Sequence, residues 1–289
     1  AVGPLNPANG YPTHYVDKQG LALEQCLTVP LDPTAPVPDP CGLTGTIPIN
    51  GDAGPIDFPL AFPAEFFYSR AVAKLTGIGG ISTNSSTLVL ALEGAVSGGG
   101  AVPDFGLQVV FTRLRVSVTA GLVPGQTYTV THPYGTFTFT ADGAGTLPRN
   151  AGTIDFGCLI APCGAFDQVL TSPVFGPFLH AVAPAPPAGY VGNPAIAQTI
   201  TGSPNGTNFF RIDGPNVGGS GVNTVQTPLF NVWGKIFTGA IPSALTVDRT
   251  SYARNATSTL VNVFAHSVAG ATVTASGTGI PTTTLTPDP

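Results

Sequence analysis

Residues 110–118 read VFTRLRVSV, and the pattern of this stretch decides the fold class. Mostly apolar side chains, including Val110, Leu114 and Val116, alternate with polar ones that include Arg113 and Arg115. A period of two residues places the two sets on opposite faces of a β-strand, whereas an amphipathic helix has a period of 3.6. The stretch therefore predicts a half-buried strand with an apolar inner face and a polar outer face.

The same alternation continues on both sides of this stretch. Residues 126–131 and 136–140 alternate apolar side chains with threonines, and the intervening His-Pro-Tyr-Gly sequence predicts a hairpin turn. Further strands are predicted at 66–74, 87–96, 208–212 and 229–237. Many short strands with turn signals between them are typical of sandwiches and barrels. We therefore expect an all-β chain whose main part is a large β-sandwich or jelly-roll-like domain.

Two segments do not fit this alternation. Residues 17–27 fit a short helix beginning at Asp17 or a strand equally well, so both remain open. Residues 181–194 are rich in proline and glycine and predict a surface loop or polyproline segment.

Composition excludes several classes of partner. The chain has 289 residues, of which only 9% are charged, and it contains 37 glycines and 30 prolines. Its net charge is −5 and it has no run of Lys or Arg, which removes the signature of nucleic-acid or anionic-membrane binding. It also has no apolar run long enough to predict a transmembrane segment. Sparse charge is compatible with self-association or with contact to other cell-surface proteins.

The first residue and the cysteines point to export. The sequence begins at Ala1, as expected of a chain whose signal peptide has been removed, so we expect an extracellular or cell-surface protein. Four cysteines permit three pairings, and the pairing of near neighbours, Cys26 with Cys41 and Cys158 with Cys163, is the simplest. A loop of about 15 residues closed by the first disulfide contributes roughly 3 kcal/mol. The second pair is too widely spaced for a C-x-x-C redox or zinc motif.

A domain boundary is predicted near Pro242, which gives a β-sandwich domain at 1–242 and a smaller segment at 243–289. In this segment, ALTVDRTSY at 244–252 followed by LVNVFAHS at 260–267 resembles the opening strands of bacterial immunoglobulin-like repeats of secreted surface proteins. That resemblance implies a stalk or spacer module without activity of its own. Such a module needs about seven strands, so the segment is predicted to be incomplete or completed by a neighbouring subunit.

Motifs of common enzyme classes are missing. The sequence contains no Gly-x-Ser-x-Gly elbow, no phosphate-binding loop and no His-Glu-x-x-His pattern. Glu65 and Glu93 are the only carboxylates near strong strand patterns, and the sequence does not identify a partner acid for either. We therefore expect no catalytic activity and no cofactor.

The densest group of functional side chains lies near the N-terminus, in Tyr11, His14, Tyr15 and Asp17. Aromatic rings can stack on sugar faces, and an imidazole with a carboxylate can contribute to a metal site. In the alternative interpretation, the tyrosines cover a sheet edge and Asp17 caps a turn. His132, His180 and His266 stand alone and are expected to be structural.

Two further sets of residues carry conditional predictions. Calcium could be held by aspartates in the early Pro/Gly loops, although these also form turns; they are Asp32, Asp39, Asp52 and Asp57. If the source glycosylates its proteins, three asparagines match the acceptor pattern, and in a bacterium they are expected to be turns; they are Asn84, Asn205 and Asn255.

These observations favour a secreted or cell-surface structural protein that assembles or presents a surface. The alternative is a carbohydrate-binding module that uses aromatic residues such as Tyr11, Tyr15, Tyr134 or Trp233. A third hypothesis is an extracellular hydrolase whose catalytic residues come from distant loops.

Overall fold

The structure is a computed structural model that describes residues 1–27, 39–41, 56–60, 62–98, 103–239, 241, 245–254, 259–267, 273–277 and 280–285. It is all-β, and the helical segments among the described residues are the short 3-10 turns η1 (Ile78–Gly80) and η2 (Gln168–Thr171). The chain forms two compact units, Ala1–Phe237 and Thr238–Pro289. The boundary predicted from sequence, after residue 242, lies a few residues beyond this division.

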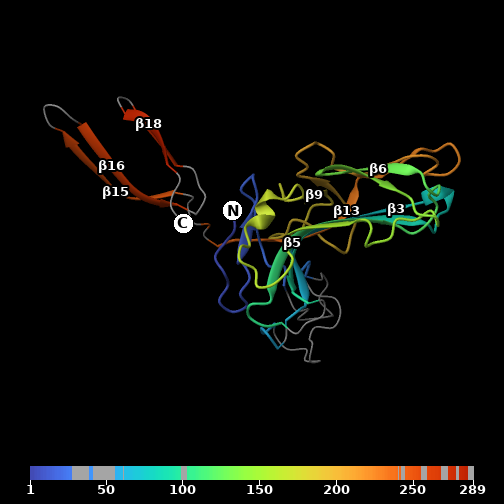
Figure 1. Ribbon diagram of the computed structural model, residues 1–289, viewed down its shortest axis with the longest axis horizontal. Helices are drawn as coiled ribbons and strands as arrows, with labels where there is room; N and C mark the ends of the chain where they lie inside the picture. Colours follow the sequence, from blue (N-terminus) through green and yellow to red (C-terminus); the bar gives the residue numbers. More distant parts are fainter. Residues whose placement is uncertain are drawn as a thin grey trace. The chain divides into compact units, whose positions relative to one another are not determined.

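A seven-stranded antiparallel sheet forms the larger layer of the first unit (Figure 1). Its strands, in spatial order, are β8 (Thr153–Cys158), β5 (Gln108–Val118), β4 (Ser85–Val96), β3 (Glu65–Thr76), β13 (Leu229–Trp233), β10 (Gln198–Thr201) and β9 (His180–Ala183). The interior strand β4 reads SSTLVLALEGAV and is buried along most of its length, as a strand covered on both faces requires.

A four-stranded sheet forms the second layer, in the order β12 (Thr224–Thr227), β11 (Phe210–Asp213), β6 (Thr127–His132) and β7 (Gly135–Thr140). Tyr128 and Phe210 from this sheet belong to the same buried cluster as Leu88, Leu90 and Leu114 from the larger sheet. The two sheets therefore enclose one apolar core, and the first unit is a β-sandwich.

The alternation on β5 is confirmed. Leu114, Val116 and Val118 are buried, while Arg113 and Arg115 are on the opposite, partly exposed face. The predicted hairpin is also confirmed, because β6 and β7 pair antiparallel across the turn at 133–134. The period-two alternation thus predicted correctly that these segments form strands and which face of β5 is buried.

A smaller sheet of three short strands, β1 (His14–Val16), β2 (Ala22–Glu24) and β14 (Lys235–Ile236), completes the first unit. In the open segment 17–27, residues 18–20 form a turn and residues 22–24 form β2, so this segment is a turn followed by a short strand. The predicted strand 229–237 is divided between two sheets at Gly234, which has a positive φ of 155° and no room for a Cβ beside Val191. The expectation of a loop throughout 181–194 is wrong at its start, since β9 extends to Ala183 before the prolines interrupt it.

Both predicted disulfides are present. Cys26 pairs with Cys41 at a Cα–Cα distance of 4.9 Å, and Cys158 pairs with Cys163 at 5.8 Å. The second disulfide follows directly on β8, and Cys158 packs with Val109 and Phe111 in a small cluster of its own. The loop closed by Cys158 and Cys163 is therefore held against the end of the large sheet.

The described residues of the second unit form two hairpins. One is β15 (Leu245–Arg254) paired with β16 (Thr259–Ser267), and the other is β17 (Val273–Gly277) paired with β18 (Ile280–Leu285). The two strands expected at 244–252 and 260–267 correspond to β15 and β16. Because the described strands fall short of the seven of an immunoglobulin sandwich, the immunoglobulin-like assignment stays a prediction.

The core contact between β3 and β4 gives a stability prediction. A Cβ at Gly94 would lie 2.3 Å from Cζ of the buried Phe66 ring, so Gly94→Ala is expected to lower the free energy of unfolding by about 1–3 kcal/mol. Gly143→Ala is the matched control, because no heavy atom lies within 4 Å of its added Cβ, and it should change stability by less than about 0.5 kcal/mol. Denaturant unfolding measures the stability of both variants. Equal effects would contradict the close packing of Gly94 against the Phe66 ring.

Candidate functional site

The N-terminal tyrosines are core residues. Tyr11 and Tyr15 are fully buried, and their hydroxyl groups donate to the carbonyl oxygens of Ala95 at 2.6 Å and Phe166 at 2.8 Å. Their rings pack against other aromatic rings, among them Phe66 and Tyr68. Neither ring presents a face on which a sugar could stack.

His14 and Asp17 also have internal partners. The buried His14 ring stacks on Phe237 at 4.0 Å, and burial together with the nearby N-terminal charge lowers the pKa of His14. One oxygen of Asp17 accepts from the backbone N–H groups of Gln19 and Leu21, and the other accepts from that of Phe178 at 2.7 Å. Asp17 caps a turn, as in the alternative interpretation, but the tyrosines lie in the core and do not cover a sheet edge.

The other aromatic and histidine candidates have similar roles. Tyr134 donates to the Pro177 carbonyl oxygen at 2.8 Å, and Trp233 is covered by a guanidinium. Burial lowers the pKa of His132 to about 4, and its Nδ1 accepts from the backbone of Tyr134. The Nδ1 atom of His180 lies 3.2 Å from the Phe178 carbonyl oxygen, and the side chain of His266 lies outside the described residues.

The calcium and glycosylation candidates are scattered. Asp39 caps the backbone of Cys41 and accepts from the Tyr190 hydroxyl. Asp57 is exposed, and Asp32 and Asp52 lie outside the described residues; among those described, no three His, Cys, Asp or Glu residues gather as metal ligands. Asn84 is partly buried and donates to the Ile78 carbonyl oxygen, whereas Asn205 is exposed in a turn. Asn255 lies outside the described residues.

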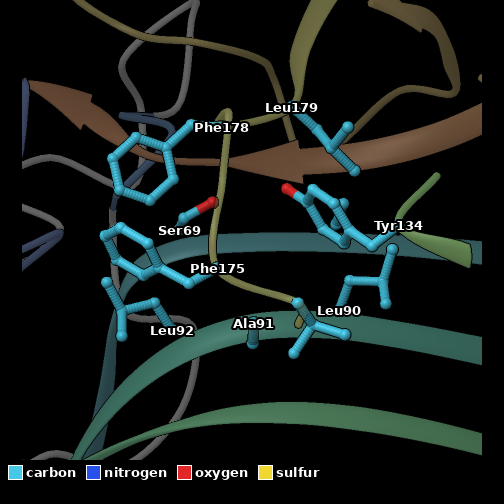
Figure 2. A pocket seen from close by; sticks show the side chains of 10 residues that line it. Ser69, Leu90, Ala91, Leu92, Tyr134, Phe175, Phe178 and Leu179 are labelled. Carbon is cyan, nitrogen blue, oxygen red and sulfur yellow. The ribbon is translucent and has the colours of Figure 1, made fainter. Parts of the chain in front are cut away.

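A cavity lies in the core between the sheets, and Figure 2 shows the side chains that line it. Its volume is about 10 Å³, which is close to the minimum for one water molecule. Its labelled lining side chains are mainly apolar: Leu90, Ala91, Leu92, Phe175, Phe178 and Leu179, with Ser69 and Tyr134 as the polar members. The cavity is a packing void and too small for an organic ligand.

The strongest polar cluster instead lies on the outer face of the seven-stranded sheet and centres on Arg113. Its Nε and Nη2 donate to both carboxylate oxygens of Asp155 on β8, each at 2.8 Å, and its Nη1 donates to Glu93 on β4 at 2.7 Å. The carboxylate of Glu65 lies 3.8 Å from the same Nη1. One arginine thus joins side chains from three other strands, and its contact with Asp155 has the bidentate geometry that makes such pairs strong.

Strand register extends this cluster into a continuous row. Trp233, Arg70, Ala91, Arg113 and Asp155 are successive register partners across β13, β3, β4, β5 and β8. Arg70 lies 4.4 Å from the ring centre of Trp233 and 5.0 Å from that of Phe67, so two cation–π contacts cover it. The row begins on an aromatic ring and ends at Asp155, on the outermost strand of the sheet.

Glu93 has an unusual environment for a carboxyl group. Its side chain is only 2% exposed, and burial together with the charge of Glu65 raises its pKa to about 8, although Arg113 opposes this shift. Burial alone would lower the pKa of Arg113, but the hydrogen bond with Asp155 and the acidic neighbours raise it. The side chain of Glu93 is therefore enclosed, whereas its neighbour Glu65 is 49% exposed and is the accessible carboxyl group of this cluster.

The row ends at β8, which has the surface features expected of a binding edge. Ile154, Phe156 and Leu159 are exposed by 55%, 41% and 46%, and Ile160, at the tip of the disulfide loop, is exposed by 80%. Two open grooves of about 540 and 640 Å³ follow this strand, and Asp155 and Leu159 line both. We call these four apolar residues with strand β8 the β8 edge.

The backbone of the β8 edge is also available. The Val116 N–H donates to the Gly152 carbonyl at 2.8 Å, and hydrogen-bonded pairs alternate along an antiparallel ladder. By this alternation, the backbone N–H and C=O groups of Thr153, Asp155 and Gly157 point away from β5. No hydrogen bond from a described residue occupies them. Unpaired groups of this kind are a template for an added strand.

The sequence placed Arg113 and Arg115 on the outer face but did not identify Asp155 as the partner of Arg113, Thr153 as the partner of Arg115, or the β8 edge. The signal was present in the Thr153–Cys158 sequence TIDFGC, where Ile154 and Phe156 alternate with polar residues. A strand of six residues that contains a glycine is too short to stand out beside the longer apolar runs.

Comparison with known proteins adds no assignment. No family model matches this chain, and no match to it was found among curated proteins or among solved structures. Its function therefore has to be inferred from the geometry of its own residues.

The raised pKa of Glu93 predicts a pH dependence of stability. Between the ordinary carboxyl pKa near 4.5 and the folded value of about 8, the folded state keeps a proton that the unfolded state loses. The contribution of Glu93 to the free energy of unfolding therefore falls as pH rises through this window, by at most about 1.4 kcal/mol per pH unit. Glu93→Gln, which stays neutral, should remove this slope.

Denaturant unfolding at pH 5, 7 and 9 measures the effect. Glu93→Gln should resemble the native chain at pH 5 and exceed its stability at pH 9. Glu24→Gln, which removes a carboxylate paired with Lys235 in another sheet, is the control and should keep the native slope. If Glu93→Gln has the native pH profile, Glu93 is already ionised in the folded protein.

Proposed function

We propose that this chain is an exported structural protein that assembles with copies of itself through its C-terminal unit. The observation that carries the proposal is the composition of the β15–β16 hairpin. On one face of this hairpin, Val261 and Val263 of β16 lie opposite Tyr252 and Thr250 of β15. Val261, Val263 and Tyr252 are exposed by 40%, 50% and 64%.

A hairpin with these properties is incomplete by itself. A two-stranded ribbon is at best marginally stable in water, and three or more strands with a shared apolar face are needed for independent stability. The opposite face also has exposed apolar side chains, Leu260 and Phe264. Addition of strands from another copy would cover these side chains and pair the free backbone groups along the hairpin edges.

Other features support an extracellular setting. Both disulfides belong to the first unit, and structural disulfides persist mainly in oxidising compartments. No helix among the described residues is long and apolar enough to span a membrane. Low charge over the whole chain reduces the electrostatic repulsion that keeps proteins apart.

The two other functions that the sequence allowed have less support. A carbohydrate-binding module needs accessible aromatic faces, but Tyr11 and Tyr15 are buried and Trp233 is covered by Arg70. A hydrolase with two carboxyl groups needs both within reach of a substrate, but Glu93 is only 2% exposed, although its neighbour Glu65 is 49% exposed. We therefore favour assembly over these two functions.

Assembly can be tested on the full chain by sedimentation velocity and electron microscopy over a range of concentrations. The native chain is expected to form oligomers or filaments. The double variant Val261→Thr/Val263→Thr keeps β-branched side chains but removes the apolar face, so we expect the concentration needed for assembly to rise at least tenfold.

Asn262→Thr on the opposite face of β16 is the matched control and should assemble at the native concentration. A native chain that stays monomeric at every concentration would refute self-assembly. In that case the exposed face of Val261 and Val263 would be a binding surface for a different cell-surface protein.

A further inference from the structure

The four outer edges of the two large sheets differ in how well they are protected. The exposed side chains of β7 are threonines, and those of β12 are Thr224 and Gln226. The β9 edge ends at Ala183, beside Pro184, Pro186 and Pro187, and proline is one of the devices that prevent edge pairing. The β8 edge also carries the polar residues Thr153 and Asp155, but the side chains that it exposes most are the apolar Ile154 and Phe156.

The β8 edge is also held in a fixed position. The bidentate pair between Arg113 and Asp155 joins β8 to β5 from the outer face. On the inner side, the Thr112 and Ser172 hydroxyls are 2.5 Å apart, beside η2, and the disulfide between Cys158 and Cys163 closes the following loop. A strand fixed in this way needs little reorganisation when a partner strand is added.

The grooves along β8 match the C-terminal hairpin in polarity, and one of the two also matches it in charge. Ile154 and Phe156 alternate with Thr153 and Asp155, just as Val261 and Val263 alternate with Asn262 on β16. The groove that Phe156 lines has the carboxylates of Asp155 and Asp167 and no basic residue among those described, whereas the other groove is lined by Arg115 and Arg149 as well as Asp155. The β15–β16 strands carry Arg249, Arg254 and Asp248 and have a net charge of +1, whereas unit Ala1–Phe237 carries the chain's net negative charge.

From these features we propose that the β8 edge is the acceptor for the β15–β16 hairpin of a second copy of this chain. Strand β16 pairs with the free backbone groups of Thr153, Asp155 and Gly157. Its Val261 and Val263 extend the apolar surface of Ile154 and Phe156, and Leu159 and Ile160 cover the end of the added strand. This inference rests on the proposed function, since it names the surface through which the copies assemble.

The pairing can be tested by disulfide crosslinking between copies. All four native cysteines are in disulfides, so an engineered cysteine supplies the one free thiol. Full-length Ile154→Cys is mixed with a tagged full-length Val263→Cys, and the mixed-mass dimer is measured after mild oxidation. Because each copy has only one new thiol, a mixed dimer can form only between copies.

Thr138→Cys is the matched acceptor control, since Thr138 is an exposed residue on the polar β7 edge. We expect at least ten times more mixed dimer from Ile154→Cys with Val263→Cys than from Thr138→Cys with Val263→Cys. We also expect Ile154→Thr/Phe156→Thr to raise the concentration needed for assembly at least tenfold, with thermal unfolding as the check that this variant is folded.

Three outcomes would overturn the inference. Equal crosslinking at β8 and β7 in a chain that assembles would refute β8 as the acceptor but leave the proposed function intact. An internal crosslink in a monomeric Ile154→Cys/Val263→Cys double variant, without mixed dimers, would show that the hairpin docks on its own copy. A native chain that never assembles would refute the inference and the proposed function together.

Discussion

The bidentate contact of Arg113 with Asp155 is the interaction on which the outer part of the large sheet depends. It places a positive charge that is largely removed from water between three carboxyl groups from β3, β4 and β8. A buried charge is costly unless it is paired and hydrogen-bonded, so the strands that supply its partners must keep their register. The contact thereby joins the outermost strand to the centre of the sheet, in a chain with only 10 basic residues.

The inner and outer faces of the large sheet are stabilised by different interactions. Between the sheets, the core is built from aromatic and aliphatic side chains whose packing is non-directional. On the outer face, the row from Trp233 to Asp155 uses cation–π contacts and ion pairs, which depend on distance and orientation. The apolar core fixes which side of each strand faces inward, and the outer row fixes the lateral alignment of five strands.

The sequence predicted the parts of this fold that depend on local periodicity. The alternation in 110–118 gave the inner and outer faces of β5, and the spacing of the cysteines gave both disulfides. It could not predict that Asp155 meets Arg113, because the two residues are 42 positions apart and their contact is set by strand order. The sequence also suggested a binding site at Tyr11 to Asp17, because these side chains are close along the chain. In the structure each of them has a different internal partner, so they do not form one site.

The β8 edge and the C-terminal hairpin are unlike surfaces, and this difference sets the symmetry of any assembly they form. A contact between two different surfaces repeats head to tail and has no internal stopping point unless the rotation closes a ring. Every open assembly would then have two chemically distinct ends, one showing an empty β8 edge and the other an unpaired hairpin. A copy without the hairpin could occupy the second end but offer no new one, so a shortened chain would stop growth at that end alone, and the polymer would lengthen only from its empty β8 edge.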